Sequence, residues 1–401
     1  MKTEKAFPIS LTLVVAILCC CHINAQDYRI QYPGALKNSY YGVNIGYINY
    51  PFSSKQLEAG NSVGLVTVPH TAVRLTLYGR QINKYLSARL TYMRPVSWVL
   101  YKNVNGDNMD HSVWMNVGGL TLAAQIPLHK KLSLAAEAGI GLITRKGFSI
   151  NNVRVIKNAT YSSVLMGGAL QYHINKKWEL QASMAWSPAH AKEKQPQTIY
   201  FAAGFNYYMR ELSPDIVERN LKSGFHFPKQ SISAGITSNV LGYGANNFVS
   251  GKLPIFWGGD VKIKHGISLS YQRNIFHSRK VFALDVGANM AHWKSKENKE
   301  NFFTASVYPV LIFNAFRTRR ADIFFEYSVA GPSYISKSLI DGNRTGKNFT
   351  FQDFMGIGMV AGKKRKLMTG LRVAHYSNGN IYPDNAGLMI PLTLNLGYVL
   401  D

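Results

Sequence analysis

The segment Leu371–Asn385, near the end of the chain, contains the residues best suited to chemistry (LRVAHYSNGNIYPDN). His375 and Ser377 are two positions apart, so on a β-strand their side chains lie on the same face. At a Cα separation of about 7 Å the side chains can meet, and the imidazole can then take the hydroxyl proton. The pair therefore has the residue types and spacing that nucleophilic catalysis needs, with an imidazole base within reach of a hydroxyl. The alternative is that both are ordinary polar residues near a strand end.

The rest of the sequence offers little other chemistry. It contains no glycine-rich phosphate-binding loop after a strand, no HExxH motif and no cysteine beyond residue 21. We therefore expect neither a metal ion nor an organic cofactor.

The composition favours a β-barrel that spans a membrane. The chain has 401 residues and is 46% hydrophobic but only 16% charged, with 23 Tyr, 20 Phe and 34 Gly. Beyond the N-terminal region, no stretch approaches the roughly 18 consecutive apolar residues of a transmembrane helix. A barrel explains this mixture, because every second residue meets lipid and aromatic residues gather at the two membrane interfaces.

Period-two alternation identifies the strands. Leu132–Ile143 and Leu388–Leu400 both alternate apolar residues with small or polar ones. The connections alternate between long loops and tight turns, such as those at Asn83–Lys84 and Ser278–Arg279, as in bacterial outer-membrane barrels. We therefore predict an all-β fold of antiparallel transmembrane strands.

The strands form two sets of eight, separated by a polar stretch at 210–230. We expect a first barrel within 26–209, a periplasmic linker at 210–230 and a second barrel within 231–401. Eight strands are enough for a closed barrel that side chains fill. One sixteen-stranded barrel is the alternative, because it fits the same order of loops and turns.

Residues 1–25 have the features of a secretory signal peptide. Lys2 and Lys5 precede an apolar run that ends shortly before a small-residue cleavage site at Ala25. A lipoprotein signal is the alternative, because Cys19–Cys21 lie at the end of the run. We expect export to the bacterial outer membrane, where the net charge of +24 suits the phosphates of anionic lipids better than nucleic acid.

Residue parity predicts that His375 and Ser377 lie on the lipid-facing wall. Leu371 shares their face, whereas Arg372 points to the opposite face, which suits a polar lumen. Their strand leads into an external loop at 379–387, so the pair lies level with the outer leaflet. The acyl ester bonds of an outer-leaflet lipid lie at this depth.

This segment resembles the lipid A 3-O-deacylase family of outer-membrane barrel enzymes. The resemblance is carried by His375-Tyr376-Ser377-Asn378 and by Asn385-Ala386-Gly387 just before the last strand. It implies an eight-stranded barrel whose Ser–His–acid triad hydrolyses an acyl ester of lipid A. It also implies that Ser377 is the nucleophile, His375 the base and Asn385 an oxyanion-hole donor, aided by Asn378. The resemblance extends at most over the second half of the chain.

The acid of the triad is the point at which this sequence departs from the family pattern. The family has an acidic residue two positions after the loop glycine, Gly387, and this chain has Met389 there. If the tight turn at 362–366 pairs residues 361 and 367, Asp353 stands opposite His375. We therefore expect Asp353 to hold the imidazole, with Asp384 as the second choice. The alternative is a carboxylate that contacts only water or loop backbone in the headgroup region.

The sequence thus predicts an esterase that acts on lipid A or a similar glycolipid. Basic residues of two external loops are candidates for binding its phosphates: Arg344, Lys347, Lys294, Lys296 and Lys299. One competing function is a non-catalytic barrel, either structural or a passive channel. Another is an adhesin that would use the long loop at 50–72. The sequence indicates no oligomeric state.

Overall fold

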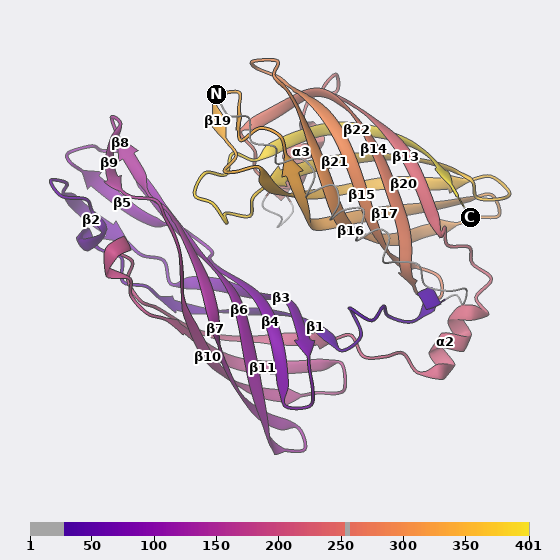
Figure 1. Ribbon diagram of the computed structural model, residues 1–401, viewed down its shortest axis with the longest axis horizontal. Coiled ribbons are helices and arrows are strands. Elements are labelled where there is room, and N and C mark those ends of the chain that lie inside the picture. The colour runs from indigo at the N-terminus through magenta and orange to yellow at the C-terminus, as the bar shows by residue number, and fades with distance from the viewer. Residues whose placement is uncertain (1–27, 253–256, 401) are drawn as a thin grey trace, which may run out of the picture.

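The computed structural model describes residues 28–252 and 257–400, so the predicted signal peptide lies outside the described residues. Two closed antiparallel β-barrels follow one another along the chain (Figure 1). The prediction of two barrels is therefore confirmed, and the sixteen-stranded alternative is excluded. We call the end of each barrel with the long loops the external end, and the end with the short turns the periplasmic end.

The first barrel closes because β6 pairs with both β4 and β7. Its eight strands are β1 (Ser39–Asn49), β3 (Thr71–Gln81), β4 (Leu86–Pro95), β6 (His111–His129), β7 (Leu132–Lys146), β10 (Ala159–His173), β11 (Trp178–Ser187) and β12 (Thr198–Tyr208). Its external end is extended by β2 (Val63–Thr67), β5 (Val99–Val104), β8 (Phe148–Ile150), β9 (Val153–Ile156) and the 3-10 helices η2 (Ser54–Gln56) and η3 (Ala191–Glu193).

Alternation along the strands separates a lipid-facing wall from a filled lumen. On β7 the outward Ile140 is 62% exposed, whereas the inward Glu137 is buried. Glu137 forms ion pairs with Arg74 at 2.6 Å and with Arg89 at 3.4 Å. The residual cavity beside these side chains has a volume of about 10 Å³, which is barely enough for one water molecule. The lumen is therefore packed at this level.

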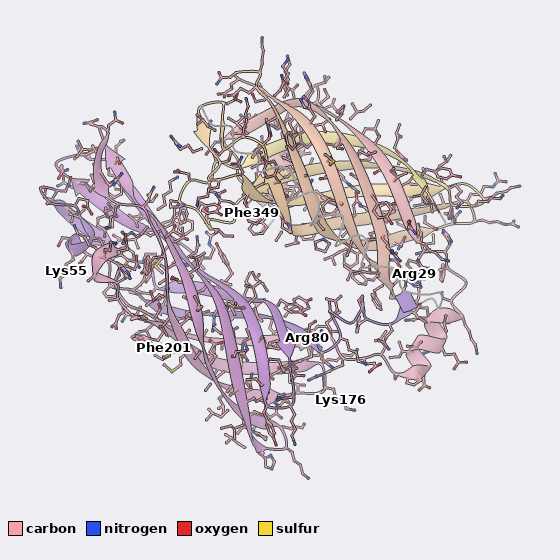
Figure 2. All side chains as sticks on the ribbon, viewed as in Figure 1. Arg29, Lys55, Arg80, Lys176, Phe201 and Phe349 are labelled. Carbon is pink, nitrogen blue, oxygen red and sulfur yellow. The ribbon has the colours of Figure 1, made fainter. Side chains whose placement is uncertain are left out.

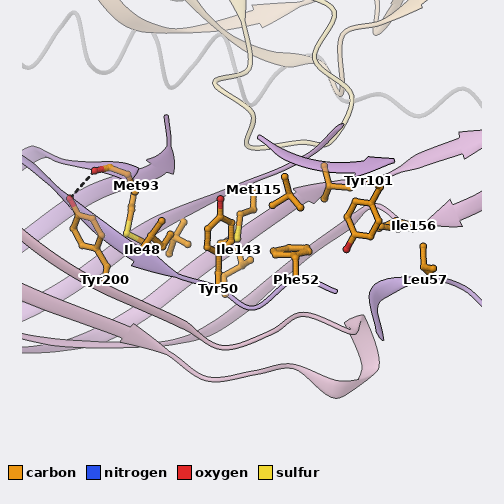
Figure 3. Packing of buried hydrophobic residues seen from close by; sticks show 14 of the residues in the cluster. Ile48, Tyr50, Phe52, Leu57, Met93, Tyr101, Met115, Ile143, Ile156 and Tyr200 are labelled. Atoms are coloured by element: carbon orange, nitrogen blue, oxygen red, sulfur yellow. Dashed lines mark hydrogen bonds between the residues drawn. The ribbon is translucent and has the colours of Figure 1, made fainter. Parts of the chain in front are cut away.

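A second layer closes the first barrel towards its external end. Figure 3 shows buried apolar side chains that pack into one cluster. They come from β1, β5, β6, β7 and the segment after β1, and include Ile48, Tyr50, Tyr101, Met115 and Ile143. Because Tyr101 lies on β5, this cluster also fixes the β2–β5 extension to the barrel.

The second barrel closes through the pairing of its first and last strands, β13 and β22. Its strands are β13 (Gln230–Ser238), β14 (Val261–His277), β15 (Phe282–Ser295), β16 (Asn301–Arg317), β17 (Ala321–Ile335), β20 (Phe349–Ala361), β21 (Leu367–Ser377) and β22 (Leu388–Val399), with the short hairpin β18 (Leu339–Ile340) and β19 (Asn343–Arg344) in an external loop. Its lumen is polar, as Arg372 predicts: the Arg372 guanidinium donates to both carboxylate oxygens of the buried Glu326.

Side chains on the outer walls match a membrane environment (Figure 2). Phe201, labelled on the wall of the first barrel, is 52% exposed. Basic side chains stand at the barrel ends, with Lys55 at the external end and Arg80 and Lys176 at the periplasmic end. Among the described helices, none is long and apolar enough to cross a membrane.

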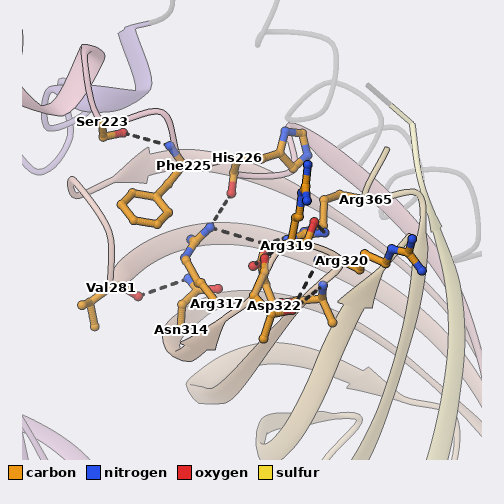
Figure 4. Close-up of polar contacts among 12 residues, drawn as sticks. Ser223, Phe225, His226, Val281, Asn314, Arg317, Arg319, Arg320, Asp322 and Arg365 are labelled. Carbon is orange, nitrogen blue, oxygen red and sulfur yellow. Dashed lines mark hydrogen bonds and ion pairs between the residues drawn. The ribbon is translucent and has the colours of Figure 1, made fainter. Parts of the chain in front are cut away.

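The expected linker contains a helix and is anchored to the second barrel. Helix α2 (Pro214–Leu221) begins with proline, whose fixed φ suits the first helical turn. After it, Arg317 donates to the His226 carbonyl at 2.8 Å (Figure 4). The Arg317 guanidinium also lies over the ring of Phe227. Asp322 pairs with Arg365, which joins two periplasmic turns. The linker end is therefore part of the periplasmic rim.

Candidate active site on the outer wall of the second barrel

His375 and Asp353 stand directly opposite each other on β21 and β20. This is the pairing that the tight turn at 362–366 predicts. The Nδ1 atom of His375 lies 3.8 Å from Oδ2 of Asp353, which is longer than a hydrogen bond but close enough for strong attraction to an imidazolium. Ser377, two residues further along β21, pairs with Phe351 and is partly exposed.

A β-bulge in β17 orients the Asp353 carboxylate. The pairing of β17 with β20 shifts between Ser328 and Gly331, so two residues of β17 stand opposite Asp353 alone. One of them, Ala330, has a φ of 51°, in the left-handed region that costs a residue with a Cβ free energy. Its backbone N–H donates to Oδ1 of Asp353. The bulge thereby leaves Oδ2 directed at His375, and bulges of this kind commonly re-aim side chains near active sites.

Met389 lies on the other side of His375. It is the cross-strand partner of His375 on β22 and is buried. The imidazole therefore stands between a carboxylate on one neighbouring strand and a thioether on the other. The position where the family resemblance implies an acid is next to the histidine, and in this chain the Asp353 carboxylate lies on the opposite side.

A segment from the β13–β14 loop covers His375. Trp257 stacks over the imidazole with the ring centroids 6.0 Å apart, and Nε2 of His375 donates to the Gly258 carbonyl at 2.7 Å. His375 is consequently only 2% exposed. The predicted outward position is thus correct, but the side chain faces another part of the same chain rather than lipid.

Helix α3 (Gly244–Lys252) extends this cover along the barrel wall. Val249 packs with Trp257 against Val373, an outward residue of β21 that would otherwise meet lipid. The side-chain amide of Asn246 donates to the Ile390 carbonyl of β22 at 2.7 Å. We call α3 together with Trp257–Gly259 the covering segment. Because this segment lies more than 100 residues before His375, no local sequence pattern indicates the contact.

Gly387 is the point of closest approach between the cover and the last strand. A Cβ at this position would lie 2.5 Å from the Gly258 carbonyl oxygen and 2.8 Å from Nε2 of His375. Only glycine fits here without displacing one of them. The loop glycine singled out in the sequence therefore has a steric role beside the imidazole.

Loop 378–387 connects β21 and β22 and is held by its own asparagines. The backbone N–H of Asn378 donates to Oδ1 of Asn385, and Nδ2 of Asn385 donates to Oδ1 of Asn380. Nδ2 of Asn378 donates to the carbonyls of Thr345 and Asp384. The amide nitrogens of Asn378 and Asn385 are thus occupied in this arrangement. The oxyanion contact expected of Asn385 requires the loop to rearrange.

The remaining predicted residues lie around this loop. The Asp384 carboxylate forms no ion pair with His375 among the described residues. Lys347 lies over the ring of Tyr382 at 5.1 Å, and the Arg344 carbonyl accepts the Ala386 N–H at 2.9 Å, so this basic loop borders loop 378–387. Lys296 lies over Tyr243, next to α3. Lys294 lies on β15 rather than in the expected loop, and Lys299 stands in the loop that follows.

Metal-binding clusters are absent from the part of the chain that the structure describes: no three His, Cys, Asp or Glu side chains there are placed to hold an ion. The chemistry that the site offers is that of a hydroxyl, an imidazole and a carboxylate on adjacent strands.

Family comparisons agree with the division into two barrels. Residues 265–398 match the family described as lipid A 3-O-deacylase (PagL), and residues 36–231 match the OmpA-like transmembrane domain. The resemblance predicted for the second half is therefore confirmed, and each match covers less than half of the chain. Both are families of outer-membrane barrels, and the outer membrane is the location of this chain.

Solved structures with the same kind of barrel are similar to parts of the chain. The outer-membrane enzyme PagL has 16% identity and a TM-score of 0.30, over 42% of this chain and 97% of that one. The N-terminal barrel of Pseudomonas aeruginosa OprF has 14% identity and a TM-score of 0.28, over 43% and 98%. Neisserial surface protein A has 13% identity and a TM-score of 0.29, over 43% and 97%. No curated protein matches the sequence.

Proposed function

Because residues 265–398 match the lipid A 3-O-deacylase family, we propose that the second barrel is an esterase of the outer membrane. Its substrate is an acyl ester of lipid A or of a similar glycolipid. The observation that carries this proposal is the pair formed by His375 and Asp353 across β21 and β20, with Ser377 on the same face as His375. This face belongs to the outer wall, where a lipid substrate arrives from the membrane.

The proposed reaction transfers the acyl group to Ser377 and then to water. Oγ of Ser377 attacks the ester carbonyl, and its proton passes to Nε2 of His375. The tetrahedral intermediate collapses, the sugar oxygen leaves with that proton, and an acyl-serine remains. A water molecule then attacks the acyl-serine while His375 takes its proton, and His375 returns that proton to Oγ of Ser377 as the bond to the acyl group breaks and the free fatty acid is released. Asp353 stabilises the imidazolium in both steps.

Loop 378–387 supplies the proposed oxyanion site. Backbone and side-chain amides are the usual donors to a tetrahedral oxyanion. Asn378, Asn385 and Gly387 are the candidates, and the internal hydrogen bonds of the loop must open for Asn385 to donate.

The described arrangement corresponds to a resting state of this enzyme. Nε2 of His375 must carry a proton, because it donates to the Gly258 carbonyl. A protonated Nε2 cannot accept the proton of Ser377, so the covering segment has to leave His375 before the reaction starts. The same movement gives the acyl chain access to the barrel wall.

The decisive test is mass spectrometry of lipid A from cells with and without the protein. We expect the wild-type protein to remove one acyl chain, and Ser377→Ala to reduce the rate at least about 10³-fold. Thr369→Ala, which removes a hydroxyl from the same face of β21 near the periplasmic end, should leave the rate unchanged. An identical acyl pattern with wild-type protein and with none would rule out the proposed function.

A further inference from the structure

Three polar side chains on the outer wall of the first barrel occupy positions that normally meet lipid. Tyr92, Asn116 and Thr144 lie on the adjacent strands β4, β6 and β7, where Asn116 and Thr144 are direct partners. Asn116 shares its face with Leu120, which is 63% exposed. An amide or hydroxyl is costly in lipid unless it has a partner. The donor groups of these three residues do have partners.

The partners are consecutive backbone carbonyls of loop 378–387. The Tyr92 hydroxyl donates to the Gly379 carbonyl at 3.3 Å, Asn116 Nδ2 to the Asn380 carbonyl at 3.4 Å, and Thr144 Oγ1 to the Ile381 carbonyl at 3.0 Å. Asn116 is only 2% exposed as a result. The first barrel therefore contacts the loop that begins directly after Ser377.

The contacted part of the loop has an unusual backbone conformation. Gly379 and Asn380 have φ angles of 61° and 58°, so two successive residues are left-handed. For Asn380 this conformation costs free energy that surrounding contacts must offset. The side chain of Asn380 also accepts the hydrogen bond of Asn385. Asn380 therefore links the wall of the first barrel to Asn385: its backbone carbonyl accepts from Asn116, and its side chain accepts from Asn385.

The two barrels are also joined at their periplasmic ends. Arg29, in the 3-10 helix η1 (Tyr28–Ile30), donates to the Phe227 carbonyl and to Asn274 of the second barrel. Gln31 exchanges two hydrogen bonds with the backbone of Leu212 in the linker. Hydrogen bonds therefore join the two halves of the chain at both the external and the periplasmic ends of the barrels.

We propose that Tyr92, Asn116 and Thr144 are positioning residues for the hydrolysis at Ser377. The first barrel is a built-in scaffold that anchors Gly379, Asn380 and Ile381, the part of loop 378–387 next to Ser377, while the Asn385 end of the loop rearranges. This role rests on the proposed function of the second barrel. It assigns a task to the first half of the chain, which lies outside the lipid A deacylase match.

Crosslinking tests the contact without reference to activity. All three cysteines of the sequence lie at positions 19–21, within the expected signal peptide, so introduced cysteines are the only ones in the mature chain. We expect a short bis-maleimide to join Asn116→Cys to Asn380→Cys in cells. A protease site inserted between Ser223 and Gly224 then gives two fragments that stay together in a denaturing gel.

The control pair combines Asn380→Cys with Thr160→Cys. Thr160 is the partner of Thr144 on β10, is exposed on the same face, and has no hydrogen bond to the loop among the described residues. Its fragments should separate. The contact is refuted if the fragments of the Asn116→Cys variant separate. It is also refuted if both cysteine pairs are crosslinked to the same extent.

Kinetics tests the positioning role in the full-length protein. We expect the triple variant Tyr92→Phe, Asn116→Leu and Thr144→Val to lower kcat about 10- to 100-fold with little change in KM, because displaced reacting groups slow the chemical step. A second triple variant carries Thr144→Ser in place of Thr144→Val. It keeps a hydroxyl at position 144 and should recover part of kcat. Thr160→Val is the matched control and should behave as wild type.

The outcomes separate the two proposals. A folded triple variant with wild-type kcat would overturn the positioning role while leaving the esterase proposal intact; heat-dependent gel mobility reports the folding of each barrel. A wild-type protein that removes no acyl chain would overturn the esterase proposal and the positioning role together. In that case the crosslink would still establish or refute the contact itself.

Discussion

His375 is flanked by Asp353 on β20 and by Met389 on β22. A carboxylate can orient Nδ1 of an imidazole from either neighbouring strand, because cross-strand partners on both sides approach to about 5 Å. In the proposed function, Asp353 therefore takes the place of the acid that the family resemblance implies at Met389. Ala330, in the bulge opposite Asp353, fixes the carboxylate by donating its N–H.

The first prediction concerns this acid. Asp353→Asn should lower kcat for lipid A deacylation about 10³- to 10⁴-fold, because the amide does not stabilise an imidazolium or hold the required tautomer. The asparagine still accepts the Ala330 N–H, so the barrel should fold as before. Adding Met389→Glu to Asp353→Asn should restore part of kcat, because it places a carboxylate on the other side of His375. The measurement is the initial rate of fatty acid release from purified lipid A.

Met389→Glu in the wild-type background is the control for this exchange, and it should fold and retain activity. Asp353 has no part in the triad if Asp353→Asn keeps the wild-type rate. A double variant that is no faster than Asp353→Asn would show that the two sides of His375 are not equivalent.

At the scale of elements, the covering segment determines whether the site is open. It belongs to the external loop between β13 and β14 and lies along β21 and β22. Its Gly258 carbonyl accepts the hydrogen bond of His375 Nε2. Such a cover keeps a buried imidazole away from lipid and water until substrate displaces it. Stacking of aromatic rings contributes about 0.5–1.5 kcal/mol, so the Trp257 ring is one of several contacts that must break when the cover opens.

The second prediction concerns the stacking contact of Trp257. Trp257→Ala should raise kcat/KM about two- to tenfold, which is the factor that corresponds to losing the stacking free energy over His375. Trp98→Ala is the matched control, because Trp98 packs against Arg94 in the first barrel. A large loss of activity in Trp257→Ala, with Trp98→Ala unchanged, would mean that Trp257 binds the acyl chain and does not restrain the site.

At the scale of the whole molecule, neither barrel is built as a pore. Arg74, Arg89 and Glu137 fill the first lumen, and Arg372 with Glu326 fills the second. Eight-stranded barrels are narrow enough for side chains to fill them. The passive channel considered from the sequence therefore has no open path at these levels.

The third prediction is that the protein does not conduct solutes. Liposomes that contain it should swell in sugar solutions no faster than protein-free liposomes, whereas a general porin at equal density should give rapid swelling. The ion pairs in both lumens would have to open for transport. Swelling above the protein-free rate would restore the channel as a function.

The sequence by itself determined the barrels, the faces of their strands and one strand register. These depend on local geometry: side chains alternate with a period of two, and a tight turn sets the pairing that follows it. This is why the position of His375 on the outer wall and its pairing with Asp353 could be derived. The segment that resembles the lipid A deacylase family was recognisable for the same reason, since its residues are close together in the chain.

Only the tertiary structure decided what surrounds that pair. The cover by Trp257 and Gly258, the bulge at Ala330 and the hydrogen bonds from Asn116 to loop 378–387 involve segments that are far apart in the sequence or irregular in backbone. No periodicity encodes them, because each depends on how complete barrels and loops pack together. Local patterns thus predicted which strand positions carry a hydroxyl, an imidazole and a carboxylate, and long-range packing decided that His375 is covered and that the first barrel contacts loop 378–387.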